Sequence, residues 1–549
     1  MTSCSKLGNL TADNFNVTPT PLEAHAGAVE ATINGTFPTK YMKKKAVVKV
    51  TPVLVYATGE TTAQSATFQG EKVLDNNTTI NYKMGGNYTM KASFPYTDQM
   101  LASDLYARFD AKLGKKTVNL PQVKIGYGVL ATSDLLSSCL RTAAGSKAAD
   151  GYQRIIEQKQ EATIKFLIGQ AKLRTSELQN VSVKDLVKIL QEINDSTEVR
   201  ALQGIEVSAY ASPDGKFSFN EKLAERRQDV SVDYLRKQMK QIGVDGNITT
   251  KFTAEDWDGF QRLIGQSNFQ DKELILRVLS MYDDPEQREA KIKEMGDIYP
   301  EIAEGIMPEL RRARMIVNYQ IIGRSDKEIA ETFVSNAAML SLEEMVYGAN
   351  NLANGTQQKE EWYKKTIQQY PNDYRAYNNL AQLYLTEGNT AKAKEMLEKA
   401  TKLNKGASEV GVNKALIALL AGNVSDAETA LAASSGADGY SEMLGNLNLA
   451  KGNYAQAAKQ LAGVKTNSAA LAAILNKDYT SAKNTLAAIP AGDATTSYLK
   501  AVLAARTNDS SSLVSHLRDA ISKDSSYAKR AARDLEFAAF KSTIESLIK

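Results

Sequence analysis

The residue with the most distinctive chemistry in this sequence is Arg227. It follows Leu223 by four positions and precedes Val230 by three, so it shares one face of a predicted helix with apolar residues. A guanidinium cannot lose its proton and is costly to bury without a partner. The position therefore predicts either a bound anion or a long side chain whose charged end reaches solvent.

The elements before this helix are predicted to bring its first turns to the end of a strand. Ile205, Val207 and Ala209 alternate with polar residues, which is typical of a short half-buried strand. Residues 212–215, with the sequence SPDG, predict a turn, and helical spacing begins at about residue 218. The predicted order is strand, turn and helix, with Arg227 near the middle of the helix.

Residues 211–227 resemble the core motif of OmpA-like peptidoglycan-binding domains, T-D-x-x-G-x-x-x-x-N-x-x-L-S-x-x-R-A, without a gap. The resemblance implies that Arg227 grips a carboxylate of diaminopimelate in the wall stem peptide. The aspartate that holds the ammonium in the family is replaced by Ser212, and Asp214 is the nearest substitute. Losing that charge-assisted hydrogen bond weakens recognition. The candidate peptidoglycan-binding residues are Arg227, Asp214, Ser212, Tyr210 and Asn220.

The same resemblance implies an α/β domain over residues 160–325. The alternation of Ala162, Ile164 and Phe166 predicts its first strand, and an amphipathic pattern over 183–193 predicts its first helix. Residues 311–319 fit the last strand of a β-α-β-α-β order. A helical insertion is expected at about 249–307, and it either covers the ligand site, replaces the ligand with a protein partner, or only packs on the sheet.

From residue 326 to residue 549 the chain is expected to form helical repeats. Gly388, Ala393 and Leu397 recur 34 residues later, and the same three types recur again 30 residues after that. This spacing resembles the tetratricopeptide repeat (TPR), in which small residues let two helices cross closely. A solenoid of five or six units usually binds a peptide or protein on its concave face. A passive spacer is the alternative.

The N-terminal third is expected to be rich in strands. Short alternating segments separated by glycine turns over residues 25–133 predict an immunoglobulin-like β-sandwich. Residues 134–159 are expected to form a linker, and residues 1–24 a polar tether. Residues 1–4, MTSC, resemble the end of a bacterial lipoprotein signal, which implies a lipid on Cys4. An accidental early cysteine is the alternative.

Composition argues against several classes of function. The sequence has two histidines, His25 and His516, and lacks the phosphate-binding loop motifs, so neither a catalytic triad nor a histidine metal site is expected. Two cysteines exclude a disulfide framework, and Cys139 is expected to be buried and inert. A net charge of +4 gives no broad footprint for nucleic acid. No enzymatic activity, cofactor or metal is predicted.

Together these patterns predict a multidomain, non-enzymatic scaffold in the bacterial outer membrane. The resemblances imply a lipid-anchored periplasmic lipoprotein that links peptidoglycan to protein partners as an accessory subunit of an outer-membrane protein assembly or secretion complex. The absence of acidic residues over 5–11 favours the periplasmic side. One alternative is a purely protein-binding subunit whose OmpA-like domain has lost peptidoglycan binding. Another is a surface adhesin or glycan-binding lipoprotein.

Overall fold

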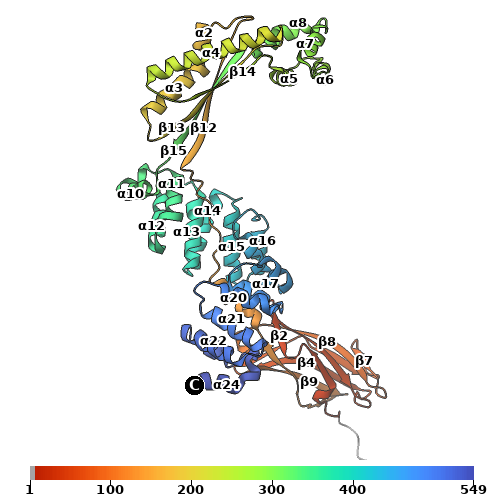
Figure 1. Cartoon of the computed structure of the whole chain (residues 1–549). Helices are drawn as coiled ribbons and strands as arrows, with labels where there is room; N and C mark the ends of the chain where they lie inside the picture. The colour runs from red at the N-terminus through yellow and green to blue at the C-terminus, as the bar shows by residue number, and fades with distance from the viewer. Residues whose placement is uncertain (1–6, 549) are drawn as a thin grey trace, which may run out of the picture. The chain divides into compact units, whose positions relative to one another are not determined.

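The computed structural model describes residues 7–548, which fall into two compact units (Figure 1). One unit combines the N-terminal residues up to 150 with the C-terminal residues from 341 onward. The other consists of residues 151–340. Over the described range, no helix combines the length and the apolar character needed to cross a membrane. Cys4, the expected lipidation site, lies outside the described residues.

The N-terminal region is built from eleven strands that form one continuous sheet. Eight of them follow one another in the order β1-β3-β2-β11-β9-β4-β6-β7, while β8 pairs with β3, β5 with β4 and β10 with β9. The strands are β1 (Phe15–Thr18), β2 (Leu22–His25), β3 (Ala28–Phe37), β4 (Ala46–Tyr56), β5 (Gly59–Thr62), β6 (Ala66–Gly70), β7 (Thr78–Ile80), β8 (Gly86–Pro95), β9 (Ser103–Leu113), β10 (Lys116–Val118) and β11 (Val123–Leu130).

This sheet folds over a single apolar core. Alternate residues of β3, β8 and β9 are buried, as expected for strands with one face on a core. The ring centroids of Phe37 in β3 and Phe68 in β6 lie 5.2 Å apart in an edge-to-face arrangement. The predicted β-rich region is confirmed. It differs from a sandwich of two separate sheets because β2 pairs with both β3 and β11 and joins the two halves.

The first strands of this region correct the expectation of a polar tether over residues 1–24. Val17 in β1 and Leu22 in β2 are buried, and Leu7 and Leu10 also join the core. The segment has few apolar residues and they are interrupted by prolines, so its sequence predicted no regular structure. Residues 7–24 are therefore part of the folded N-terminal region.

The unit of residues 151–340 has a four-stranded sheet with helices packed on it. Its strand order is β12-β15-β13-β14, with β15 antiparallel to both of its neighbours and β13 parallel to β14. Apolar residues of the sheet and of α3 and α4 form its core. Its elements before the insertion and after it are β12 (Ile155–Lys165), α2 (Thr175–Leu178), α3 (Val181–Asp195), β13 (Arg200–Tyr210), α4 (Phe217–Ile242), β14 (Ile248–Thr253), β15 (Arg312–Ile322) and α10 (Asp326–Asn336).

The insertion in this unit is helical, but its expected start at residue 249 was wrong. Residues 248–253 form β14, which is an edge strand of the sheet. The helices that follow have a core of their own, centred on Phe260, Ile264 and Ile302. They are α5 (Trp257–Gln266), α6 (Lys272–Met281), α7 (Pro285–Lys293), α8 (Ile298–Gly305) and α9 (Met307–Leu310).

The C-terminal region is a series of antiparallel helix pairs, as the repeat spacing predicted. It begins at α11 rather than at residue 326, because α10 belongs to the other unit. The helices are α11 (Leu342–Tyr347), α12 (Gly355–Gln369), α13 (Tyr374–Thr386), α14 (Thr390–Leu403), α15 (Ser408–Leu420), α16 (Val424–Leu431), α17 (Tyr440–Ala450), α18 (Tyr454–Gln460), α19 (Asn467–Leu475), α20 (Tyr479–Ala488), α21 (Ala494–Arg506), α22 (Ser510–Lys523), α23 (Ser526–Ala531) and α24 (Lys541–Ile548).

Two apolar positions that recur in the second half of the repeat are buried in five successive helix pairs. In each pair, the turn between the two helices contains a residue at positive φ. The first buried position follows that residue by five positions and the second by nine. The turn residues are Gly388, Gly422 and Gly452 in the first three pairs, and Lys477 and Asn508 in the last two. The buried residues are Ala393, Leu397, Ala427, Leu431, Ala457, Leu461, Ala482, Leu486, Leu513 and Leu517.

The turn at Lys477 gives a prediction about stability. Lys477 has a φ of 63°, a conformation that costs a residue with a Cβ about 1 kcal/mol. Lys477→Gly is expected to raise the free energy of unfolding of the repeats by about 0.5–1 kcal/mol. Gly452→Ala, at a φ of 76° in the preceding pair and with open space around its Cβ, is the matched control and should lower it. Urea unfolding followed by circular dichroism measures both, and a destabilised Lys477→Gly would contradict this reading.

Candidate functional site

Arg227 lies in α4 with its side chain directed into the unit of residues 151–340. Its exposed fraction is 0%, and its neighbours Leu223 and Ala224 are also buried. The guanidinium donates hydrogen bonds to three backbone carbonyls, those of Gln170 (3.0 Å from Nε), Tyr210 (2.9 Å from Nη1) and Leu167 (3.2 Å from Nη2). The inward position predicted from sequence is therefore confirmed.

The partner of Arg227 is neither of those expected. The guanidinium meets neutral carbonyl oxygens instead of an anion or solvent, and it lies 5.2 Å from the ring centroid of Phe166. Burial, followed by the nearby charge of Arg311, lowers the pKa of Arg227 to about 10, so the group stays charged at neutral pH. The atoms bonded to the buried cation are thus carbonyl oxygens, and the charge of Asp214 acts on it without a hydrogen bond.

The turn between β13 and α4 is closed by a second network. Arg311 donates to Ser212 Oγ (3.1 Å) and to Asp214 Oδ2 (2.6 Å), and Ser212 Oγ donates to Asp214 Oδ1 (2.8 Å). Asn220 donates to the carbonyls of Ser212 and Gly215. The structure thus brings these predicted residues together. Asp214, the proposed substitute for the family's aspartate, is already paired with Arg311.

Tyr210, the remaining candidate, lies beside a buried ion pair. The Arg312 guanidinium carbon lies 4.7 Å from the Tyr210 ring centroid, and its Nη2 is 2.7 Å from Asp256 Oδ2. The side chains of Arg312 and Asp256 are only 9% and 7% exposed. From the sequence, Arg311 and Arg312 were assigned to the last strand of the domain and were not identified as part of this cluster. Asp256 lies inside the segment assigned to the insertion, so no signal pointed to it.

A second candidate site lies on the first helices of the repeats, within the other unit. The chain leaves the β-rich region through a short 3-10 helix η3 (Thr132–Leu135) and α1 (Leu136–Leu140), and then continues to residue 150 without further helix or strand. Figure 1 shows this segment in orange beside the repeat helices. Expected as a linker, it is instead held by side chains of α13 and α15. Residues 155–159, also expected in the linker, belong to β12.

Two asparagines make the central contacts with this segment. Asn413 Oδ1 accepts a hydrogen bond from the Ser146 amide (2.7 Å), and its Nδ2 donates to the Ser146 carbonyl (2.7 Å). Asn379 makes the same pair of bonds with Ala148, at 2.7 and 3.0 Å. Ser146, Ala148 and both asparagines are buried. The first helices of these repeats thus hold a segment of their own chain.

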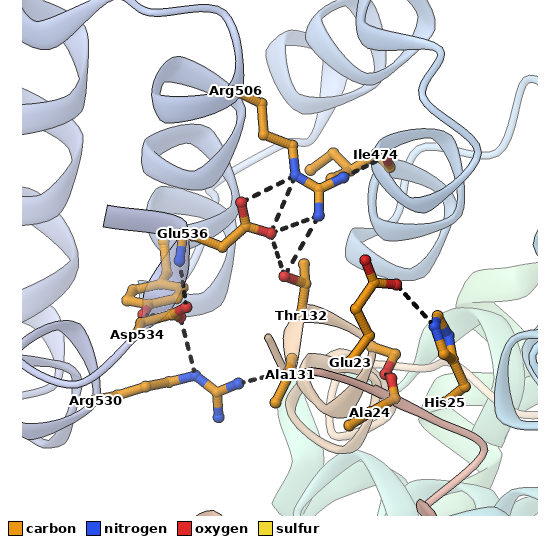
Figure 2. A network of polar contacts seen from close by, with 12 residues as sticks. Glu23, Ala24, His25, Ala131, Thr132, Ile474, Arg506, Arg530, Asp534 and Glu536 are labelled. Atoms are coloured by element: carbon orange, nitrogen blue, oxygen red, sulfur yellow. Dashed lines mark hydrogen bonds and ion pairs between the residues drawn. The ribbon is translucent and has the colours of Figure 1, made fainter. Parts of the chain in front are cut away.

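The last repeats are joined to the β-rich region by charged residues (Figure 2). Arg506 donates from Nε to Glu536 (3.0 Å) and from Nη1 to the Ile474 carbonyl (3.0 Å), while Thr132 bonds Glu536. Arg530 donates to the Ala131 carbonyl at 3.0 Å.

Two neighbouring groups extend this junction. Asp534 is 4% exposed and accepts from the Tyr498 hydroxyl at 2.7 Å, and burial raises the pKa of its carboxyl. His25 contacts Glu23 and the hydroxyl of Tyr454. The β-rich region and the repeats are thus parts of one unit.

Two other features of the described residues bear on chemistry. Residues 7–548 hold no group of three or more His, Cys, Asp or Glu side chains placed to bind a metal. Cys139 is buried in α1, and burial raises the pKa of its thiol. A thiol in that state is a poor nucleophile.

Comparison with protein-family models matches residues 374–406, which are α13 and α14, to the tetratricopeptide repeat. The chain contains a tetratricopeptide repeat. This fold is a protein-interaction fold and is not typically enzymatic, and it implies protein partners in general. No curated protein matches the chain.

Several solved structures are similar to parts of this chain at low identity. A tetratricopeptide repeat protein from Parabacteroides merdae is 13% identical, with a TM-score of 0.28 over 41% of this chain and 89% of that one. PilF from Pseudomonas aeruginosa is 19% identical, with a TM-score of 0.28 over 40% of this chain and 100% of that one. The Cut9–Hcn1 complex of APC/C is 13% identical, with a TM-score of 0.33 over 59% and 67%.

The carbonyl-bound state of Arg227 gives a second prediction. Arg227→Met is expected to lower the free energy of unfolding by about 3 kcal/mol or more, because three carbonyls lose their donors. Arg226→Met is the matched control, since Arg226 is exposed on the same helix, and it should stay within about 0.5 kcal/mol of wild type. Chemical denaturation measures both, and equal stability of the two variants would contradict a structural role for Arg227.

Proposed function

We propose that this protein is a non-enzymatic scaffold that holds protein partners and whose OmpA-like α/β unit no longer grips peptidoglycan. Support for the OmpA-like assignment comes from the order β12, α3, β13 and α4, with β15 following the helical insertion; β14 adds an edge strand beside β13 to the expected β-α-β-α-β pattern. Support for the scaffold role comes from the tetratricopeptide repeat. The two units supply separate surfaces on one chain, which raises the effective concentration of whatever they hold.

The observation that carries the loss of wall binding is the burial of Arg227. A side chain that grips a stem-peptide carboxylate has to offer its guanidinium to the ligand. Here three donor positions are committed to carbonyls at 2.9–3.2 Å, and the residue is 0% exposed. Binding a carboxylate would require breaking these bonds first. Asp214, the only candidate to replace the family's aspartate, would in turn have to leave Arg311.

Peptidoglycan binding remains the second candidate, and one observation favours it. Ser212, Asp214, Asn220 and Arg311 form one connected cluster, and the charges of Arg311 and Asp214 act on Arg227. This is the gathering of polar residues that the resemblance to the OmpA-like family requires. Wall binding would then use the Arg311–Asp214 pair as its charged centre.

Sedimentation with purified sacculi distinguishes the two candidates. The full-length protein is mixed with sacculi that contain diaminopimelate, and an OmpA-like domain with the intact motif serves as the positive control. We expect the protein to stay in the supernatant, because its guanidinium and carboxylate are already paired. Sedimentation that free diaminopimelate competes away would contradict this and would establish wall binding.

We also propose that the protein is a lipoprotein anchored through Cys4 on the periplasmic side of the outer membrane, as an accessory subunit of an assembly or secretion complex. Support comes from the MTSC sequence at residues 1–4 and from the two resemblances. A diacylated cysteine with a further amide-linked chain supplies more than one acyl chain, which stable anchoring requires.

The lipid anchor predicts the location of a Cys4 variant. In cells that process lipoproteins, wild type is expected in the membrane fraction with incorporated labelled palmitate, and Cys4→Ala in the soluble fraction without label. Cys139→Ala is the matched control and should behave as wild type. Label retained in Cys4→Ala would contradict the anchor, and digestion of the protein by protease on intact cells would favour the surface adhesin instead.

A further inference from the structure

The segment of residues 142–150 presents its backbone to the repeats with a period of two. The groups that bond to repeat side chains belong to Ala144, Ser146, Ala148 and Asp150. From Ser146 onward, bonded and unbonded residues alternate as in an extended chain, while Gly145, at a φ of 67°, turns the chain between Ala144 and Ser146. Lys147 and Ala149, which lie between them, are exposed. The segment is therefore bound in the way that an added strand binds a sheet edge, although its partners are side chains on helices.

The two central asparagines occupy equivalent places in successive repeats. Asn379 lies nine residues before the turn at Gly388, and Asn413 lies nine residues before the turn at Gly422. Each side-chain amide uses its donor and its acceptor on the same backbone residue, Ala148 or Ser146. An amide group matches a peptide unit in both respects. The repeat spacing therefore creates a repeated device that recognises a peptide backbone.

Neighbouring polar residues fix the asparagines and bind the ends of the segment. Asn378 is 0% exposed, donates to the Ser146 carbonyl (3.1 Å) and to Asn379 Oδ1 (3.1 Å), and accepts from Asn413 Nδ2 (3.0 Å). Gln382 donates to the Ala144 carbonyl, and Arg375 donates to the Asp150 carbonyl (2.6 Å). Such connected networks hold each amide in one orientation.

The segment has small side chains where it touches the helices. Ser146 and Ala148 are each 1% exposed. Gly145 has a φ of 67°, and a Cβ there would lie 2.4 Å from Asn413 Oδ1. The hydroxyl of Ser146 is buried and has no hydrogen-bond partner in the described part of the chain. Recognition thus depends on backbone groups and on the close approach of the segment to the helices. The side chain of Ser146 is not recognised by a hydrogen bond.

We propose that the first-helix face of α13 and α15 is a binding site for an extended peptide with small residues, and that its ligand is the chain's own segment 142–150. The segment is covalently attached, so it competes at an effective concentration in the millimolar range against peptides from other molecules. The site is occupied in cis, and partners held by the repeats bind to other surfaces. This proposal is independent of wall binding, so the sacculus experiment does not bear on it.

The test uses a labelled synthetic peptide with the sequence of residues 142–150 and two full-length proteins. One protein is wild type, and the other, the replaced variant, carries Ser146→Pro and Ala148→Pro, which remove the two amide hydrogens that the asparagines accept. Fluorescence anisotropy should show binding to the replaced variant and binding at least about tenfold weaker to wild type. Equal binding to both proteins, or no binding to a folded replaced variant, would overturn the proposal.

Two altered peptides test whether the backbone is what the site recognises. Ser146→Pro removes the amide hydrogen that Asn413 accepts, and it should abolish binding to the replaced variant. Ser146→Ala removes only the unbonded hydroxyl and should bind as well as the original peptide. If the alanine peptide loses as much affinity as the proline peptide, backbone recognition is wrong.

Hydrogen exchange in the wild-type chain decides the matter if the replaced variant fails to fold. The amide hydrogens of Ser146 and Ala148 are bonded to buried asparagines, so they should exchange at least about 100-fold more slowly than in the free peptide. Asn413→Ala should restore fast exchange at Ser146 more than at Ala148. Exchange at the free-peptide rate in the native wild-type chain would show that the segment is not held.

Discussion

Backbone N–H and C=O groups that are buried away from water need hydrogen-bond partners. The unit that contains the repeats depends on how residues 142–150 satisfy this requirement. The segment belongs to neither a helix nor a sheet, so its buried amides and carbonyls have no regular partners. Asn379 and Asn413 provide them, one residue for each peptide unit. Together with the junction of Arg506, Glu536 and Thr132, these contacts combine the β-rich region and the repeats in one compact unit.

In the α/β unit the group that needs partners is a buried charge. Arg227 is compensated by carbonyls of β13 and of the loop after β12, so it ties α4 to these elements. A residue that the family resemblance assigns to a ligand thus has a structural role in this protein. The charged pairs that remain at the turn, Arg311 with Asp214 and Arg312 with Asp256, are internal as well. This internal pairing is the basis for the proposal that the unit no longer grips peptidoglycan.

Features encoded by local spacing were predictable, and features formed by distant segments were not. The recurrence of Ala393 and Leu397 defined the helix pairs, because each pair is built from neighbouring residues. The inward direction of Arg227 followed from its helical face, but its acceptors at Leu167 and Gln170 come from a loop some 60 residues earlier. Residues 15–25 have two four-residue strands separated by prolines, too short for a clear alternation. The segment AAGSKAAD over 143–150 has no pattern at all, since its partners bond to its backbone.

The most direct measurement of the central claim is digestion of the native full-length protein with trypsin. Lys147 has an exposed side chain, but its neighbours Ser146 and Ala148 are bonded on both sides through their backbone. A protease has to take the chain into its own cleft, so a held backbone resists cleavage even at an accessible lysine. We expect the bond after Lys147 to stay intact in the native protein and to be cut readily once the protein is unfolded. Prompt cleavage after Lys147 in the native protein would show that the segment is free and would contradict the account.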